Sequence, residues 1–191
     1  MLRDLGAEVL EFPCIVTETL KNTEAVLPRS FDGFGWVGFT SAAGVESFFE
    51  LLKHARRDVR ELGDANVAAV GPATREALES RGLKVSFVPE IYGGAHLAEG
   101  LADRACGARV LLLRAEDGSP ELTDVLAKRG VPFEEVSVYR TKLAEWGFCP
   151  SRFDAVVFTS ASTVRGFCAA CPHGRDVWAV CIGRQTAKAA Q

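Results

Sequence analysis

The chain has 191 residues, a mass of 20.6 kDa and a formal net charge of −3, and its length suits one large domain or two small ones. The acidic balance argues against a broad basic surface for nucleic acid, and no apolar run reaches the ~18 residues that a membrane-spanning helix needs. Because the first residues are also too polar for a signal peptide, we expect a cytoplasmic protein without nucleic-acid or membrane partners.

Short apolar runs alternate with segments of helical spacing through the middle of the chain. In chain order we predict strands at 36–40, 67–70, 83–88, 109–114 and 132–138, and helices at 42–55, from Pro72, at 94–104 and at 120–129. The strands read as continuous β-branched or leucine runs, which is typical of a parallel sheet covered by helices on both faces. The sequence therefore predicts an α/β fold with a flavodoxin-like, doubly wound domain.

Two segments of the chain repeat in the same order. The pattern FTSAxxVxxF begins at Phe39 and again at Phe158, 119 positions later. A second pair of similar segments begins at Val70 and at Ile182, which are 112 positions apart. Because both pairs keep their order and nearly the same offset, we interpret the chain as two copies of one α/β unit.

The second copy is cut short, and the first residues of the chain hold only the end of such a unit. Neither fragment can bury a sheet alone, so we expect residues 1–13 and 153–191 to build one discontinuous domain, domain 1. Residues 31–136 form domain 2, and both domains are expected to be flavodoxin-like parallel-sheet domains. The crossings at 14–30 and 137–152 contain extended β-branched stretches, which we expect to pair as a two-stranded β linker.

Domain 1 lacks two pieces that domain 2 has. There is no counterpart of the strand at 109–114 before Met1, and none of the segment 80–101 after Gln191. The repeat therefore predicts that domain 1 is truncated at both ends of this chain. The alternative is a smaller, divergent domain 1, which would leave an open sheet edge exposed.

Two motifs resemble cofactor or metal sites without meeting the requirements of one. Gly33 to Gly38 fit G-x-G-x-x-G, but this motif precedes a strand instead of joining a strand to a helix, so we expect no dinucleotide. Cys168, Cys171 and His173 lack a second pair of ligands to complete a zinc site, so we expect no metal. Without an export signal, the cysteines are all expected to be reduced thiols: Cys14, Cys106, Cys149, Cys168, Cys171 and Cys181.

Polar residues stand in both copies where a predicted strand ends and a helix begins. They are Thr40, Ser41 and Gly71 in the first copy, and Thr159, Ser160 and Gly183 in the second. In open α/β sheets this edge binds ligands, and free backbone N–H groups with hydroxyls suit anions such as carboxylates. Serine and threonine here also cap helices, which does not exclude binding. Tyr139 lies in a crossing segment, where it is either a proton donor on the wall of a cleft or a packed strand aromatic.

Taken together, these residues resemble the uroporphyrinogen-III synthase family. The resemblance rests on the paired FTSAxxVxxF segments, on 69–74 (AVGPAT), on 136–141 (VSVYRT) and on 181–187 (CIGRQTA), and it covers essentially the whole chain. It implies two α/β domains joined by a two-stranded linker, with the active site between them. The implied enzyme is a cofactor-free lyase that cyclises hydroxymethylbilane to uroporphyrinogen III, with loss of water and inversion of ring D through a spiro intermediate.

The resemblance also implies roles for single residues. Tyr139 matches the family's tyrosine, the proposed acid that helps the substrate hydroxyl leave as water. The other matching positions would hold substrate carboxylates, largely with backbone amides: Thr40, Ser41, Gly71 and Thr74 in domain 2, and Ser160, Ser162, Gly183 and Thr186 in domain 1. We expect a monomer that acts on this small-molecule linear tetrapyrrole. The alternative is a non-catalytic two-domain binding or regulatory protein with an anion-binding cleft between its domains.

Overall fold

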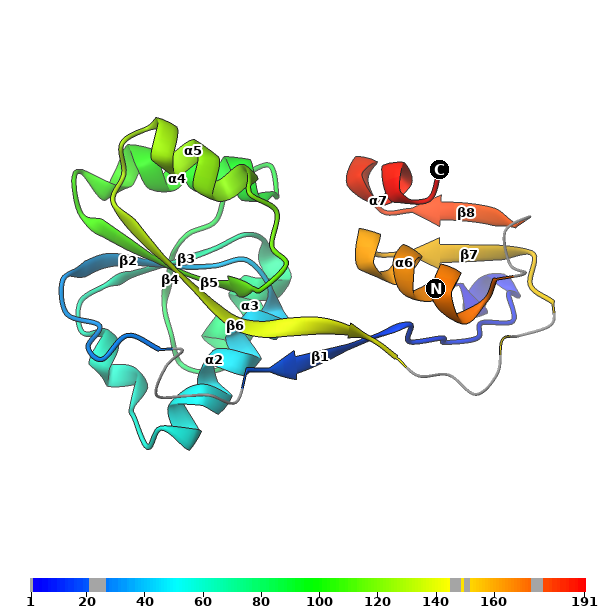
Figure 1. Cartoon of the computed structure of the whole chain (residues 1–191), viewed down its shortest axis with the longest axis horizontal. Coiled ribbons are helices and arrows are strands. Elements are labelled where there is room, and N and C mark those ends of the chain that lie inside the picture. The colour runs from blue at the N-terminus through cyan, green and yellow to red at the C-terminus, as the bar shows by residue number, and fades with distance from the viewer. Residues whose placement is uncertain (1, 21–26, 145–148, 150–151, 173–176) are drawn as a thin grey trace. The chain divides into compact units, whose positions relative to one another are not determined.

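The computed structural model describes residues 2–20, 27–144, 149, 152–172 and 177–191 (Figure 1). The chain divides into two compact units, unit 1 with Met1–Val16 and Thr141–Gln191, and unit 2 with Thr17–Arg140. The predicted domain boundaries stay a prediction. Parts of the predicted crossings, at 21–26, 145–148 and 150–151, lie outside the described residues, as does His173.

The centre of unit 2 is a six-stranded sheet in the order β1-β6-β5-β2-β3-β4. Each pair from β4 across to β6 is parallel. The elements of this unit after β1 (Ile15–Thr19) are, in chain order, β2 (Phe34–Phe39), α2 (Ala42–His54), η2 (Val59–Leu62), β3 (Asn66–Ala69), α3 (Pro72–Glu79), β4 (Val85–Phe87), α4 (Gly94–Ala105), β5 (Arg109–Ala115), α5 (Glu121–Lys128) and β6 (Phe133–Leu143).

Helices cover both faces of this sheet, as expected from the apolar strand runs (Figure 1). On β5, Leu111 and Leu113 belong to one core cluster, whereas Val110 and Leu112 belong to the other. The first cluster also takes side chains from α2 and α3, and the second takes side chains from α4 and α5. Because successive strand residues point to opposite faces, a strand buried on both sides must be apolar throughout. The predicted α/β fold with a parallel sheet is therefore confirmed for unit 2.

The strand order differs from the flavodoxin type. Counted from β2, the parallel strands lie in the order 3-2-1-4-5, whereas a flavodoxin-like sheet has 2-1-3-4-5. The difference arises because the chain adds β3 and β4 in succession on one side of β2 before it crosses to β5 on the other side. The order therefore reverses between β2 and β5, and in such sheets this switch point is where ligands bind.

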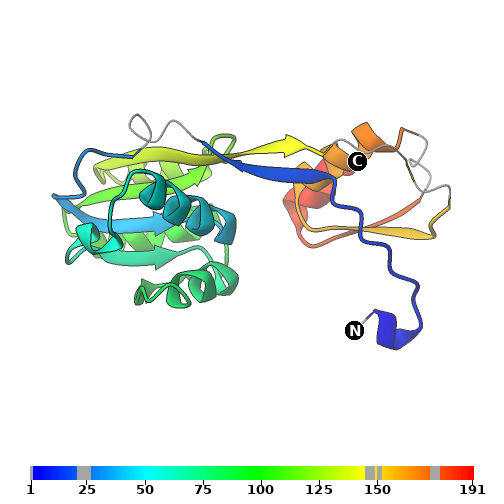
Figure 2. The same ribbon diagram turned by 90° about the horizontal axis from the view of Figure 1, so that it is seen from below.

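Strands β1 and β6 lie side by side in both views (Figures 1 and 2). The amide of Leu20 donates to the carbonyl of Val138 at 3.1 Å, and the amide of Ala144 donates to the carbonyl of Cys14 at 3.0 Å. The two contacts fix an antiparallel pairing, since residue numbers rise on one strand as they fall on the other. Residues 15–17 and 138–141 thus lie on neighbouring strands, whereas the role of the pair as a domain linker stays a prediction.

Unit 1 contains the second copy of the repeat. It has η1 (Arg3–Leu5), β7 (Ala155–Phe158), α6 (Ala161–Ala170), β8 (Trp178–Cys181) and α7 (Arg184–Ala189), and β7 pairs with β8 in parallel. The two copies share their core contacts in detail. Phe39 and Phe48 meet edge to face at 5.5 Å and 70°, and Phe158 and Phe167 meet at the same distance and angle. The sequence repeat therefore corresponds to a repeated β-α-β-α arrangement.

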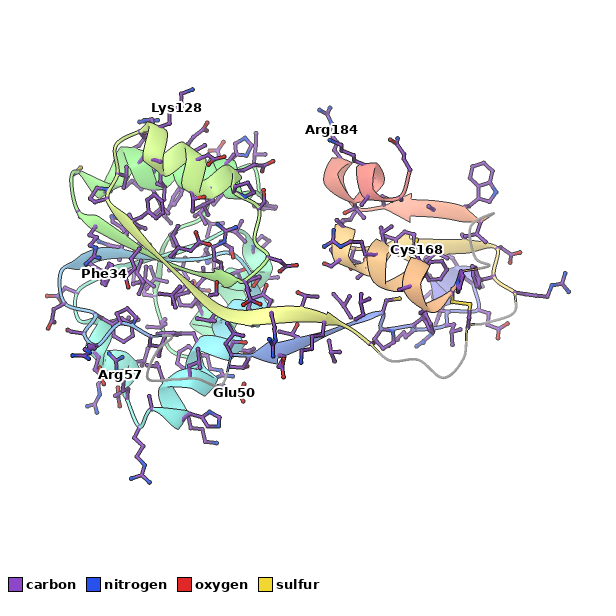
Figure 3. All side chains as sticks on the ribbon, viewed as in Figure 1. Phe34, Glu50, Arg57, Lys128, Cys168 and Arg184 are labelled. Atoms are coloured by element: carbon purple, nitrogen blue, oxygen red, sulfur yellow. A yellow bond between two sulfur atoms is a disulfide. The ribbon has the colours of Figure 1, made fainter. Side chains whose placement is uncertain are left out.

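One expectation about the cysteines is wrong. Cys149 and Cys171 form a disulfide, with 5.3 Å between their Cα atoms, and Figure 3 shows the sulfur–sulfur bond in unit 1. The sequence separation of 22 residues hides this proximity, which arises because Cys171 ends α6. Burial and the nearby Cys168 raise the pKa of the Cys14 thiol, which stays free. Within the described ranges, no helix is long and apolar enough to cross a membrane.

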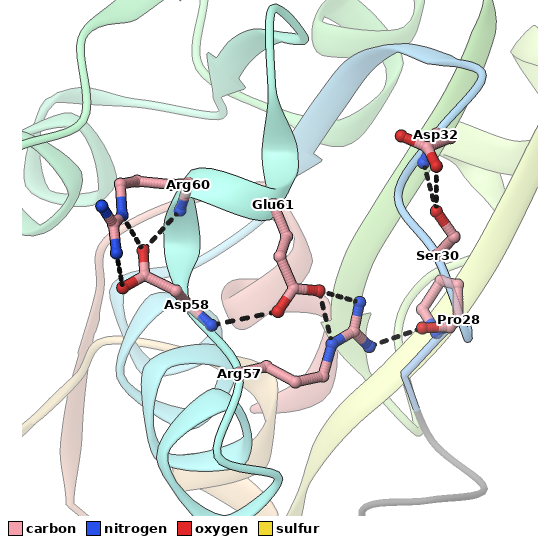
Figure 4. A network of polar contacts seen from close by, with 7 residues as sticks. All are labelled: Pro28, Ser30, Asp32, Arg57, Asp58, Arg60 and Glu61. Carbon is pink, nitrogen blue, oxygen red and sulfur yellow. Dashed lines mark hydrogen bonds and ion pairs between the residues drawn. The ribbon is translucent and has the colours of Figure 1, made fainter.

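The segment after α2 is held by a polar network (Figure 4). The Arg57 guanidinium lies 4.3 Å from the centre of the buried Phe31 ring and donates to the carbonyl of Pro28 at 2.6 Å and to the Glu61 carboxylate at 2.8 Å. The amide of Asp58 donates to the same carboxylate. This cluster ties η2 to the segment that leads into β2.

Candidate functional site

The carboxyl ends of the parallel strands in unit 2 lie at one edge of the sheet. Phe39 pairs with Ala69 on one side and with Leu113 on the other, and Ala115 pairs with Tyr139. The residues that follow β2 and β3 therefore share an edge with the middle of β6. The switch point between β2 and β5 lies at the same edge, so a ligand-binding arrangement is expected there.

Ser41 and Tyr139 meet at this edge. Ser41 is the N-cap of α2, and its Oγ accepts a hydrogen bond of 2.9 Å from the amide of Gly44. A second hydrogen bond of 2.9 Å joins the same Oγ to the phenolic oxygen of Tyr139. Tyr139 is only 9% exposed and belongs to the core cluster that includes side chains of α2. The arrangement fixes both the ring and the hydroxyl of Tyr139.

Gly44 provides the space for this contact. A Cβ atom at position 44 would lie 3.2 Å from Ser41 Oγ and 3.6 Å from Cε1 of Tyr139. The first distance is tighter than an ordinary van der Waals contact. A side chain at this position would therefore press on the hydrogen-bonded pair. Gly44 was not among the residues that the sequence singled out; the signal was in the repeat, where Thr163 is its counterpart.

The start of α3 lies at the same edge. Gly71 is the N-cap, no side chain caps the helix, and Pro72 occupies the first turn. The first-turn amides of α3 thus lack the side-chain acceptor that Ser41 gives to α2. Tyr92 lies against this turn, 3.5 Å from the Cβ that a substitution at Gly71 would add. Thr74 is buried, whereas Thr40 is half-buried.

The unit 1 candidates occupy matching positions. Ser160 is the N-cap of α6, where its Oγ accepts from the amide of Thr163 at 3.2 Å and contacts Ser162 Oγ at 3.1 Å. Gly183 is the N-cap of α7 and is exposed, and Thr186 is buried like its counterpart Thr74. Five of the nine candidates lie in unit 2: Thr40, Ser41, Gly71, Thr74 and Tyr139. The other four lie in unit 1: Ser160, Ser162, Gly183 and Thr186. Each role stays a prediction.

Two charged residues lie next to Tyr139: Arg140 follows it in the chain, and Glu116 contacts its backbone. Arg140 donates to the Glu18 carboxylate at 2.7 Å, and this hydrogen bond raises the pKa of Arg140. The amide of Glu116 donates to the carbonyl of Tyr139 at 2.8 Å, which holds the backbone of β6 against the end of β5. The cation next to Tyr139 is therefore already engaged by a carboxylate.

The surroundings of the glycine motif and of the cysteine motif give no support for a cofactor or a metal at either one. The glycine motif at 33–38 lies almost wholly within β2, not at a strand-to-helix turn, and a Cβ at Gly35 would lie 2.5 Å from the Ala108 side chain. Gly35 therefore serves close packing. Among the described side chains, no three histidine, cysteine, aspartate or glutamate residues are grouped as a metal site would require.

Comparisons with known proteins agree on one family. The family model described as "Uroporphyrinogen-III synthase HemD" matches residues 1–191. The porphyrin biosynthesis protein HemD of Ruminiclostridium josui is 34% identical over 202 residues, which cover 100% of this chain and 40% of that protein. A putative uroporphyrinogen-III synthase of Methanothermobacter thermautotrophicus is 34% identical over 176 residues, covering 85% of this chain and 66% of that protein. The chain thus spans less than two thirds of these relatives.

A solved structure shares the fold. The crystal structure of uroporphyrinogen-III synthetase from Helicobacter pylori 26695 aligns with a TM-score of 0.70 at 21% identity, covering 93% of this chain and 79% of that chain. A mutant uroporphyrinogen III synthase from the extremely thermophilic bacterium Thermus thermophilus aligns with a TM-score of 0.64 at 23% identity, covering 98% of this chain and 80% of that chain.

Proposed function

Since the chain belongs to the uroporphyrinogen-III synthase family, we propose that it cyclises hydroxymethylbilane to uroporphyrinogen III, with loss of water and inversion of ring D. The observation that carries the proposal is the hydrogen bond between Tyr139 and Ser41 at the switch-point edge. A phenol held there by a fixed partner is oriented to give a proton to a substrate oxygen. The proposed activity is that of a lyase acting in tetrapyrrole biosynthesis.

The proposed chemistry begins with proton transfer from Tyr139. The phenol protonates the hydroxymethyl oxygen, the carbon–oxygen bond breaks, and water leaves. The carbon that loses the hydroxyl is then attacked by the ring D carbon that already carries the methylene bridge from ring C, which forms the spiro intermediate. The older carbon–carbon bond to this bridge then breaks, and the bridge carbon bonds to the free α carbon of ring D, so that the ring is inverted. The ring carbon that closes the macrocycle loses a proton, which restores the Tyr139 phenol, so that the overall change is loss of one water.

The protein's remaining task is to select one cyclisation geometry. Without guidance the linear tetrapyrrole closes with ring D uninverted, so binding must favour the folded conformation that leads to the spiro centre. We propose that first-turn amides of α3, together with Thr40, Gly71 and Thr74, hold substrate carboxylates in unit 2. We propose the same role for Ser160, Ser162, Gly183 and Thr186 of unit 1. We further propose that the protein acts as a cytoplasmic monomer and uses no cofactor.

The direct test is product analysis after incubation with freshly generated hydroxymethylbilane. We expect type III product from the wild-type chain, and from Tyr139→Phe a fall in the type III rate of roughly a hundredfold or more, the usual contribution of a general acid. Phenylalanine keeps the buried ring, so circular dichroism should confirm that the fold is retained. Substrate bound by folded protein with only type I product would contradict the enzyme and leave the binding-protein alternative.

A further inference from the structure

We infer that Ser41 is a positioning residue for Tyr139, and that its hydroxyl stabilises the tyrosine once the proton has left. This inference rests on the proposed function, in which Tyr139 is the acid. It assigns to Ser41 a task other than the substrate contact expected from the sequence. The contacts that carry it all lie within unit 2.

The hydrogen bonds of Ser41 leave only two arrangements. Its Oγ already accepts from the Gly44 amide, so its remaining groups are one proton and one lone pair. Either Ser41 donates to Tyr139, and the phenol proton is free to face the substrate, or Tyr139 donates to Ser41 and its proton is occupied. Once Tyr139 has lost its proton, only the first arrangement exists, because a phenolate can only accept.

Ser41 therefore favours the deprotonated state of Tyr139 over the protonated one. An interaction that is stronger after proton transfer than before it lowers the barrier, rather than simply tightening binding. The Gly44 amide strengthens this effect by polarising the Ser41 hydroxyl, since hydrogen bonds in a chain reinforce one another. Ser41 also stands at the positive end of α2, a helix of 13 residues, which favours negative charge on Tyr139.

The second copy of the repeat shows that capping alone does not explain this arrangement. Ser160 caps α6 in the same way as Ser41 caps α2, but Thr163 stands where Gly44 would be. The Thr163 hydroxyl accepts from the Ser160 amide at 3.2 Å and so completes a capping box. A glycine is therefore not needed to cap this turn. At position 44 a Cβ would meet the Tyr139 ring as well as Ser41 Oγ, so glycine leaves room beside the hydrogen-bonded pair.

The hydrogen bond can be observed without substrate. The chain has two tyrosines, Tyr92 and Tyr139, so ¹³C labelling at tyrosine Cζ gives two NMR resonances that Tyr92→Phe assigns. We expect Ser41→Ala to shift the Tyr139 resonance, since this carbon senses the hydrogen bonding of its hydroxyl. Ser160→Ala, which removes the matching cap, should leave that resonance in place. An unmoved resonance in Ser41→Ala, or an equal shift in both variants, would overturn the inference.

Kinetics then separate positioning from capping and from substrate binding. Ser41→Ala should lower kcat for type III product roughly ten- to hundredfold, the usual value of one hydrogen bond to a charged group, with KM changed less than about twofold. Ser41→Thr keeps the cap and the hydroxyl and should recover most of kcat. Ser41→Asp keeps a strong cap but has no donor, so it should stay impaired.

The outcomes also distinguish the two proposals. A rise in KM at unchanged kcat would return Ser41 to substrate binding, and full activity in Ser41→Asp would reduce its task to capping. Either result would overturn the inference while the proposed function stands. If the wild-type chain forms no type III product, the proposed function fails, and the NMR comparison still decides whether Ser41 holds the Tyr139 hydroxyl.

Discussion

Gly44 lies in the first turn of α2, close to both Ser41 and Tyr139. A Cβ here meets Ser41 Oγ, Cε1 of Tyr139 and the carbonyl oxygen of Leu113 within 3.2 to 3.6 Å. Glycine inside a helix costs up to about 1 kcal/mol of stability relative to alanine. Glycine at position 44 therefore lowers the stability of the helix, and at the same time it leaves room for the hydroxyls of Ser41 and Tyr139.

Gly44→Ala should separate these two effects. We expect the midpoint of thermal unfolding to stay level or rise, because alanine favours the helix, whereas kcat should fall roughly ten- to hundredfold as the Tyr139 hydroxyl is displaced. Differential scanning calorimetry and the rate of type III formation measure the two quantities on the same sample. Unchanged activity, or loss of activity in parallel with unfolding, would contradict the placement argument.

At this scale the sequence names candidate residues, but it does not predict which of them meet. Ser41 and Tyr139 were both candidates, from a helix start and from a crossing segment. Their contact joins positions 98 residues apart and depends on the order of β6, β5 and β2, which no local pattern encodes. Gly44 escaped notice because a single glycine within a helical pattern has no specific signal, except as a mismatch between the two copies of the repeat.

Among the elements, the strands of unit 2 follow their apolar runs closely. The exception is β6, which was expected to end at residue 138 and continues to Leu143. Up to Tyr139 the strand is paired with β5, and farther along it lies beside β1, where one side faces solvent and polar residues are tolerated. The strand order was not predictable either, because strand composition gives no information about which neighbour a strand takes.

The turn after α2 makes a prediction about acid stability. The hydrogen bond from Arg57 lowers the pKa of Glu61 below its usual 4.5, and hydrogen bonds from Arg60 lower that of Asp58 below 3.8. Folding therefore releases protons from these carboxyls, and their contribution to stability is complete above about pH 4.5. It is lost as the pH falls through the lowered values, because the unfolded chain then binds more protons.

Glu61→Gln should remove the contribution of Glu61 to this pH dependence. We expect the urea midpoint to fall less between pH 6 and pH 3 in the variant than in the wild type. Glu99→Gln is the matched control, since it removes an exposed carboxylate of α4 that makes no ion pair in the described part of the chain. An equal pH response in the Glu61 variant and the wild type would contradict the role of this network.

For the whole molecule, the disulfide gives the two units different responses to reduction. Cys149 and Cys171 close a loop with a sequence separation of 22, and such a link stabilises a fold by about 3 kcal/mol through restriction of the unfolded chain. Both cysteines lie in unit 1, and Cys171 is part of its core. Unit 2 contains neither.

Reduction should therefore loosen unit 1 selectively. In hydrogen–deuterium exchange, we expect dithiothreitol to speed exchange in β7 and α6 while β2 and β5 stay protected. The Cys149→Ser, Cys171→Ser variant is the control: it should exchange like the reduced wild type and be insensitive to reductant. A uniform change across both units, or no change in unit 1, would refute the selective effect.

The division of the chain into a continuous unit and a discontinuous one also predicts an order of folding, with unit 2 before unit 1. Unit 2 has all its residues once the chain reaches Arg140, whereas unit 1 must join residues from both sides of it. Gly166 packs closely on Cys14, since a Cβ at position 166 would collide with the Cys14 carbonyl oxygen, and this contact joins residues far apart in the sequence. In a folded unit 2, the pairing of β1 with β6 holds the two chain segments that lead into unit 1 side by side. The long loop between the two parts of unit 1 is then already mostly closed, which removes much of the entropic cost of bringing those parts together. We therefore expect unit 2 to become protected before unit 1 when the chain refolds.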